Sequence, residues 1–184
     1  MIEVNIQNIV ASAILAQKLD LPLIAQSIVG TEYEPEQFPG LIYRLKEPKT
    51  ATLLFSSGKV NCTGAKSIKD VHESLNVISS ELRKIGIEIN SINELGVIVQ
   101  NIVATANLNG EMNLNQVAIG LGLENIEYEP EQFPGLVYRI KKPKVAMLLF
   151  SSGKIVCAGG RSIEEISLAV EKLEDELRAQ DLFL

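Results

Sequence analysis

The alternation of apolar and polar residues predicts the same series of elements twice along the chain: strand, short helix, three strands, long helix. Residues 4–12 and 97–105 alternate with a period of two, as a half-buried strand does. A short helix is expected at residues 21–29, where Asp20 can cap the first turn and Pro22 suits its start. Strands at 41–46, 50–55 and 59–64, with proline and glycine turns between them, predict a meander.

The long helix has the strongest pattern. Ser67 is a typical N-cap, and Gly86 supplies a stop after the last apolar residue. Between them, apolar residues recur at spacings of three and four: Ile68, Val71, Leu75, Ile78, Leu82 and Ile85. A similar stripe follows Ser162. Because such a helix buries one face, each copy is expected to pack its long helix on one face of its sheet.

The chain is an internal duplication. Residues 33–68 match residues 128–163 at 26 of 36 positions without a gap, and the segment from Val4 matches the one from Val97. Two copies are too few for a solenoid, which needs about three stacked units. The sequence divides into a first repeat, residues 1–92, and a second repeat, residues 93–184, which ends in an acidic tail. A closed pseudo-two-fold arrangement of the copies is expected.

The strands carry apolar residues on both faces, so the face opposite the helix needs a cover. Alternation sends Leu54 to one side and Leu53 with Phe55 to the other. Leu148, Leu149 and Phe150 repeat this pattern. An uncovered apolar face marks a binding surface, whereas helices on both faces, or a symmetric homodimer, would bury it. The pattern alone favours neither alternative.

Two further features favour a binding surface. Phe38 and Phe133 stand in proline-flanked turns, where phenylalanine is a poor core residue, and Phe55 and Phe150 end a strand. Basic residues lie on or beside the same strands: Arg44, Lys59, Arg139 and Lys154. Apolar wedges with a basic margin are typical of proteins that enter the DNA minor groove.

The net charge argues against nucleic acid at first sight, but the charges are segregated. The chain has a net charge of −6 and a pI near 4.9. Residues 41–66 hold five basic residues against one acid, and residues 136–161 hold six basic residues and no acid. Residues 164–184 hold seven acids against two basic residues. One surface is therefore expected to be basic and another acidic.

Other functions find little support in the residues. Cys62 and Cys157 lack metal-ligand or disulfide spacing, so both are predicted to be buried small hydrophobes, and neither metal nor cofactor is expected. The single histidine, His72, falls on the polar side of the long helix and is expected to be solvated. No nucleotide-binding or hydrolase motif occurs, so no enzyme is expected. The apolar runs are too short for a membrane span of about 20 residues, which predicts a cytoplasmic protein.

Three pairs of sequence blocks resemble the signature of the TATA-box-binding protein (TBP) family over essentially the whole chain. They are QNIVAS and QNIVAT, FPGLIYRLKEPK and FPGLVYRIKKPK, and LLFSSGKVNCTGAKS and LLFSSGKIVCAGGRS. The similar halves and the acidic tail resemble the archaeal form. The resemblance implies an α+β fold, a pseudo-two-fold saddle with a ten-stranded antiparallel sheet, helices on the convex face and DNA under the concave face. It also implies a general transcription initiation factor associated with the archaeal nucleoid.

The resemblance implies a role for each candidate residue. Four would wedge between base steps and kink the DNA: Phe38, Phe55, Phe133 and Phe150. Base and groove contacts would come from Asn8, Val10, Leu53, Asn61 and Thr63 in the first repeat and from Asn101, Val103, Leu148, Val156 and Ala158 in the second. Phosphate contacts, which fix register without reading sequence, would come from Arg44, Lys59, Arg139 and Lys154.

Minor-groove chemistry explains the two asparagines that the resemblance implies. The Asn8 and Asn101 amides can donate to A N3 and T O2, whereas a guanine amine would clash.

The strand before the long helix departs from the family pattern of Val and Thr. Asn61 adds a polar group in the first repeat, and Ala158 removes the threonine hydroxyl in the second.

The implied partners are double-stranded TATA-box DNA, transcription factor B and the RNA polymerase pre-initiation complex, with no membrane. Transcription factor B would dock on the second-repeat turn at Glu129 and Glu131.

Because the halves are nearly equal and minor-groove acceptors barely distinguish A·T from T·A, the protein alone is expected to bind TATA DNA in both orientations. A homodimer of the free protein is left open. The alternative is a saddle-shaped protein-interaction module without DNA binding, which would lack salt-dependent DNA affinity.

Overall fold

The computed structural model describes residues 1–91 and 94–184. The helices are α1 (Leu21–Ser27), α2 (Ile68–Lys84), α3 (Leu114–Leu121) and α4 (Ile163–Ala179), with a 3-10 turn η2 (Leu123–Asn125). The strands are β1 (Val4–Ile14), β2 (Thr31–Glu32), β3 (Leu41–Leu45), β4 (Thr50–Leu54), β5 (Lys59–Ala65), β6 (Ile98–Asn107), β7 (Ile126–Glu127), β8 (Leu136–Lys141), β9 (Lys144–Leu149) and β10 (Lys154–Gly160). The element order repeats, as the sequence predicts.

The strands form a ten-stranded sheet with the order β2-β3-β4-β5-β1-β6-β10-β9-β8-β7. The meanders β2 to β5 and β7 to β10 are antiparallel throughout, and β1 and β6 pair antiparallel with β5 and β10. The order reads the same from either end, as a duplication requires. The predicted ten-stranded antiparallel fold of two repeats is confirmed. The two-residue strands β2 and β7 were not visible in the apolar pattern.

The chain folds into two compact units. The first unit is Asn8–Gln100, and the second unit is Met1–Gln7 together with Asn101–Leu184. The boundaries fall inside β1 and β6, so each repeat contributes a few strand residues to the unit of the other. Within the second unit Gln7 Nε2 donates to Thr105 Oγ1 at 3.2 Å, and within the first Gln100 Nε2 donates to Ser12 Oγ at 2.9 Å. The division at residues 92 and 93 stays a prediction about the sequence repeats.

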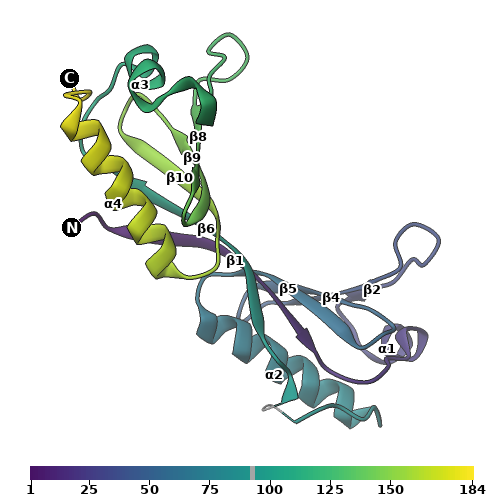
Figure 1. Ribbon diagram of the computed structural model, residues 1–184. Helices are drawn as coiled ribbons and strands as arrows, with labels where there is room; N and C mark the ends of the chain where they lie inside the picture. The colour runs from purple at the N-terminus through teal and green to yellow at the C-terminus, as the bar shows by residue number, and fades with distance from the viewer. Residues whose placement is uncertain (92–93) are drawn as a thin grey trace. The chain divides into compact units, whose positions relative to one another are not determined.

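In the first unit α2 lies along one face of the sheet (Figure 1). Its apolar stripe is buried as predicted at four positions: Val71, Leu75, Ile78 and Leu82 are at most 1% exposed. Ser67 Oγ accepts the Asp70 N–H at 3.0 Å and caps the start. The helix ends in a Schellman motif at Gly86. This glycine has a φ of +88°, and its N–H donates to Arg83 O. The sequence therefore sets both ends of this helix.

The second unit repeats this arrangement with α4. Ser162 Oγ accepts the Glu165 N–H at 3.2 Å. The buried stripe consists of Ile166, Val170, Leu173 and Leu177. The first residues of both stripes, Ile68 and Ile163, are 42% and 37% exposed, so the cores begin one turn into each helix. The short helix α1 is also confirmed, with Asp20 as its N-cap, but it ends at Ser27.

The opposite face of the sheet carries no helix in either unit, over the residues that the structure describes. Leu54 and Leu149 are fully buried on the helix side, whereas Leu53 and Leu148 are half-exposed on the other. We call this second side the open face. Its half-buried residues include Val10, Leu53 and Asn61 in the first unit and Val103, Leu148 and Val156 in the second. The alternative of helices on both faces is therefore wrong for the described chain.

The core under α2 contains polar side chains that the core under α4 lacks. Thr50, Thr52 and Ser74 are buried, and 95 residues later the chain has Val145, Met147 and Ala169. Thr50 Oγ1 and Ser74 Oγ share a hydrogen bond of 2.8 Å. Ser79 is also buried, and its hydroxyl finds no partner among the described residues. A buried hydroxyl without a partner costs stability.

We expect Ser79→Ala to raise the free energy of unfolding. The substitution removes an unpaired hydroxyl and improves helix propensity, effects worth together about 1 kcal/mol. Ser74→Ala is the matched control, because it removes the shorter of the two hydrogen bonds of the Thr50 hydroxyl and should lower the free energy of unfolding by about 1 kcal/mol. Urea unfolding of both variants measures the contrast. Equal destabilisation by both would contradict the expectation.

Candidate nucleic-acid interface

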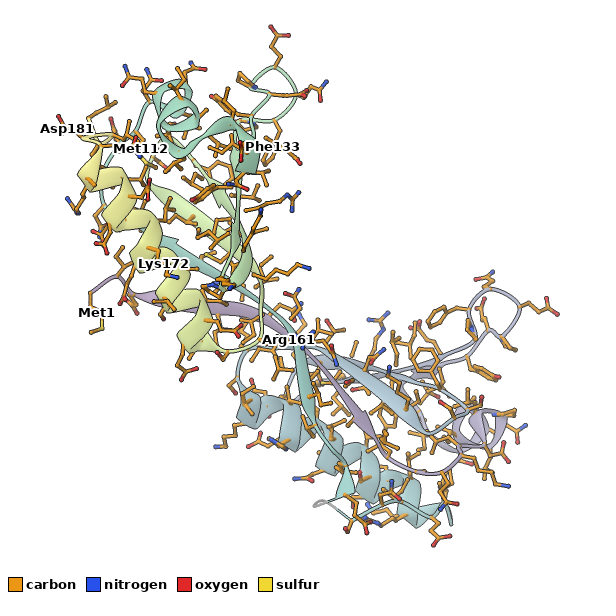
Figure 2. The ribbon with its side chains drawn as sticks, viewed as in Figure 1. Met1, Met112, Phe133, Arg161, Lys172 and Asp181 are labelled. Carbon is orange, nitrogen blue, oxygen red and sulfur yellow. The ribbon has the colours of Figure 1, made fainter. Side chains whose placement is uncertain are left out.

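Each open face carries a pair of phenylalanines. Phe38 lies in the turn before β3, and Phe55 follows β4; their ring centroids are 6.0 Å apart at 71°, edge to face. Phe133 and Phe150 form an equivalent pair at 6.1 Å and 71°. Phe133, labelled in Figure 2, belongs to the turn before β8. Phe38 and Phe133 are 41% and 46% exposed, so the pairs present apolar edges to solvent.

The turn and its glycine set the position of each pair. The N–H groups of Gln37 and Phe38 both donate to Glu34 O at 3.0 Å, which closes the turn. A Cβ on Gly40 would lie 2.8 Å from Phe38 Cε1 and 3.0 Å from Phe55 Cε1. Gly135 stands in the same relation to Phe133 and Phe150. The FPG sequence therefore leaves space that the two rings occupy, a role that the sequence alone did not reveal.

Two asparagines have their amides oriented by the backbone. Asn8 Oδ1 accepts the Gly64 N–H, and Asn101 Oδ1 accepts the Gly159 N–H, both at 2.7 Å. The glycines have φ of +90° and +100° and lie where the register of β5 with β1, and of β10 with β6, shifts. Because each carbonyl is used inside the sheet, the Nδ2 group remains as the free end. Each unit thus presents an amide donor.

Strand register assembles the apolar part of each open face. In the first unit Ile42, Leu53 and Asn61 are direct neighbours on β3, β4 and β5. The corresponding set in the second unit is Val137, Leu148 and Val156. The structure therefore brings the predicted groove residues together strand by strand. Ile42 and Val137 were not among them, although the alternation along their strands could have indicated both.

The candidate phosphate-binding residues are all exposed. Lys59 and Lys154 begin β5 and β10. Arg44 Nε lies 3.4 Å from Glu32 Oε1, and Arg139 Nη2 lies 3.6 Å from Glu127 Oε1. Exposed ion pairs of this kind contribute at most about 1 kcal/mol, so a phosphate can displace the carboxylate. The acidic partners on β2 and β7 were missed because those strands were not predicted.

A hollow of about 780 Å³ lies against the open face of the second unit. Phe150, Lys154 and Val156 line it, together with Glu3 and Asn5 from the start of the chain. The lining is partly apolar and carries one charge of each sign, Lys154 and Glu3. No group of His, Cys, Asp or Glu suited to a metal ion is found among the described residues.

The two cysteines and the histidine have no role in these faces. Cys62 and Cys157 are fully buried and free, as predicted. Burial raises the pKa of Cys157 to about 12. Burial also raises the pKa of Cys62, and the hydroxyl of Thr52 offsets part of that rise. Both thiols are therefore unreactive at neutral pH. His72 is exposed on α2, as expected.

Glu129 and Glu131 are exposed in the turn between β7 and β8. Gln132 N and Phe133 N donate to Glu129 O at 3.0 and 2.9 Å, the same pattern as in the first unit. The acidic turn is therefore hydrogen-bonded to the backbone of Phe133, one member of the phenylalanine pair. None of the helices in the described part of the chain is long and apolar enough to cross a membrane.

Comparison with known proteins identifies relatives of this chain. The family model described as transcription factor TFIID (or TATA-binding protein, TBP) matches residues 3–85 and 96–179. A TATA-box-binding protein of Thermoplasma acidophilum is 57% identical over 176 residues, which cover 96% of this chain and 95% of that protein. TATA-box-binding protein E of Halobacterium salinarum is 53% identical over 95% of this chain and 92% of its own length.

A solved structure gives the same result. Methanococcus jannaschii TBP matches with a TM-score of 0.88 and 47% identity, over 96% of this chain and 99% of that one. The chain belongs to the TATA-binding protein family. The family assignment made from the sequence blocks is confirmed.

Proposed function

We propose that this protein is a general transcription initiation factor that binds TATA-box DNA, with the open face of each unit against the minor groove. The observation that carries the proposal is the orientation of Asn8 and Asn101. Their carbonyls accept the N–H groups of Gly64 and Gly159 at 2.7 Å, which leaves the Nδ2 groups as the free ends that meet a ligand. The minor groove of A·T pairs offers only acceptors, A N3 and T O2. The names of the relatives support the same ligand.

The phenylalanine pairs serve as wedges in this proposal. Phe38 and Phe55 in the first unit, and Phe133 and Phe150 in the second, insert between base steps and kink the duplex. Inserted apolar side chains unstack DNA at a cost of a few kcal/mol per step, which is offset by the larger contact surface of bent DNA; this family is the usual example of that mode. The apolar floor then contacts sugars and base edges: Val10, Leu53, Thr63, Val103, Leu148, Val156 and Ala158.

The basic residues hold the phosphates. Lys59 and Lys154 form no ion pair with any residue that the structure describes, and Arg44 and Arg139 exchange their exposed glutamate partners for phosphate oxygens. Each cation that neutralises a phosphate releases a counterion, so affinity falls as salt rises. The acidic turn at Glu129 and Glu131 is the proposed dock for transcription factor B, which in turn recruits RNA polymerase.

A gel-shift and bending assay tests the proposal. Wild type is expected to bind and bend a TATA duplex, to bind a G·C-rich duplex of equal length much more weakly, and to lose affinity steeply with increasing salt. A protein-interaction module would show no salt-dependent DNA binding. Equal affinity for the two duplexes, or no binding to either, would overturn the proposal.

The close approach of Gly40 to the rings gives a second test. We expect Gly40→Ala to displace Phe38 and Phe55 and to weaken TATA binding by roughly tenfold, or about 1.4 kcal/mol. The free energy of unfolding should hardly change, because the added methyl meets only the ends of two movable rings. In a Phe38→Ala/Phe55→Ala background the same substitution should have no further effect on affinity. If Gly40→Ala weakened TATA binding equally in wild type and in the Phe38→Ala/Phe55→Ala background, Gly40 would not act through these two rings.

A further inference from the structure

The open faces of the two units differ in polarity at one position. Asn61 on β5 pairs with Leu53 on one side and Ser12 on the other. Val156, at the same register in the second unit, pairs with Leu148 and Thr105. Both residues are half-buried on the open face. An amide in one unit therefore replaces an isopropyl group in the other within nearly equal surroundings.

The Asn61 amide differs from that of Asn8 in its freedom. Asn8 has its oxygen engaged by the Gly64 N–H, so the Nδ2 group is the end that it presents to a ligand. The Asn61 side chain makes no hydrogen bond to any described residue of the chain, so its rotation can present either Nδ2 or Oδ1. This residue can donate to a minor-groove acceptor and can equally accept from a minor-groove donor.

Guanine supplies that donor. A G·C pair keeps the acceptors of the minor groove and adds the N2 amine of guanine. Against Val156 the amine loses its water and gains no partner, which is costly. Against Asn61 the amine can donate to Oδ1.

We propose that Asn61 makes the open face of the first unit tolerant of one G·C pair, whereas Val156 restricts the second unit to A·T pairs. The inference rests on the proposed minor-groove binding. The inference also restricts the expectation that the protein alone binds TATA DNA in both orientations. An element made only of A·T pairs is bound both ways, but an element with one G·C pair is bound with that pair under the first unit.

The test measures the affinity of wild type, Asn61→Val and Val156→Asn by fluorescence anisotropy. The duplexes are an all-A·T element, a series with one G·C pair moved through each position of one half, and a series with one such pair in each half. Asn61→Val copies the residue found at the equivalent place in the second unit, so the fold should be retained, and urea unfolding checks this.

Wild type should bind the all-A·T element and at least one single-G·C element with similar affinity. The affinity of Asn61→Val for that single-G·C element should fall roughly tenfold more than its affinity for the all-A·T element, as expected for one unpaired buried donor. Val156→Asn should gain affinity for the corresponding element with a G·C pair in each half. Replacing guanine by inosine, which lacks the N2 amine, should abolish the difference between wild type and Asn61→Val.

Equal losses for wild type and Asn61→Val at every position would overturn the inference, as would a difference that persists with inosine. Failure of wild type to bind even the all-A·T element would instead overturn the proposed function. The two failures are therefore distinguishable within one set of measurements.

Discussion

Asn8→Asp and Asn101→Asp should each weaken TATA binding by more than roughly 100-fold while leaving the fold intact, because a buried charge facing acceptors costs about 3 kcal/mol or more. An aspartate can still accept the Gly64 or Gly159 N–H, so the contact at 2.7 Å within the sheet is retained. Its second oxygen, however, stands where the amide donor stood. That oxygen would face A N3 and T O2, which are themselves acceptors.

Asn115→Asp is the matched control for these variants. It makes the same change of charge at an exposed position on α3. Anisotropy titrations at constant salt, together with urea unfolding, separate lost recognition from general repulsion and from unfolding. If the aspartate variants at positions 8 and 101 bound TATA DNA like the control, the assigned orientation of the amides would be wrong.

Removal of one phenylalanine pair should reduce both bending and affinity. We expect Phe38→Ala/Phe55→Ala to lose about 2 kcal/mol or more of binding free energy, as truncated aromatic anchors do. The bend measured by energy transfer between dyes at the duplex ends should decrease substantially, because one of two kinks is lost. The free energy of unfolding should fall much less than for core phenylalanines, since Phe38 is 41% exposed and the pair lies outside the helix-side core.

Phe38→Leu/Phe55→Leu is the control for this prediction. Leucine is also used as a wedge between base steps, so this variant should keep a large part of the bend. The corresponding variants of Phe133 and Phe150 should behave alike, because the second pair has nearly the same geometry. A full bend in the alanine variant would show that the rings do not insert.

Much of the fold follows from periodicity. The helical stripe from Val71 to Leu82 and the caps at Ser67 and Gly86 determine α2 from local residues alone. The short strands β2 and β7 could not be predicted this way. Each has two residues and is held by register with its neighbour, Thr31 opposite Tyr43 and Ile126 opposite Tyr138. Two residues carry too little alternation to be recognised.

The candidate site was predictable in its residues more than in its geometry. The position of Phe38 in a turn and of Leu53 opposite Leu54 along a strand indicated an exposed apolar face. The hydrogen bond from Gly64 to Asn8 joins residues 56 positions apart at a register shift, and no local pattern encodes it. The exchange of strand residues between units, seen at Gln7, has the same origin in long-range pairing.

The most direct test of minor-groove recognition replaces every A·T pair of a TATA element with I·C. Such pairs resemble A·T in the minor groove, because hypoxanthine lacks the N2 amine, but they resemble G·C in the major groove. We expect wild type to bind the I·C duplex nearly as tightly as the TATA duplex and far more tightly than the matching G·C duplex. Affinity for the I·C duplex as low as that for G·C would contradict recognition of the minor groove by the open faces.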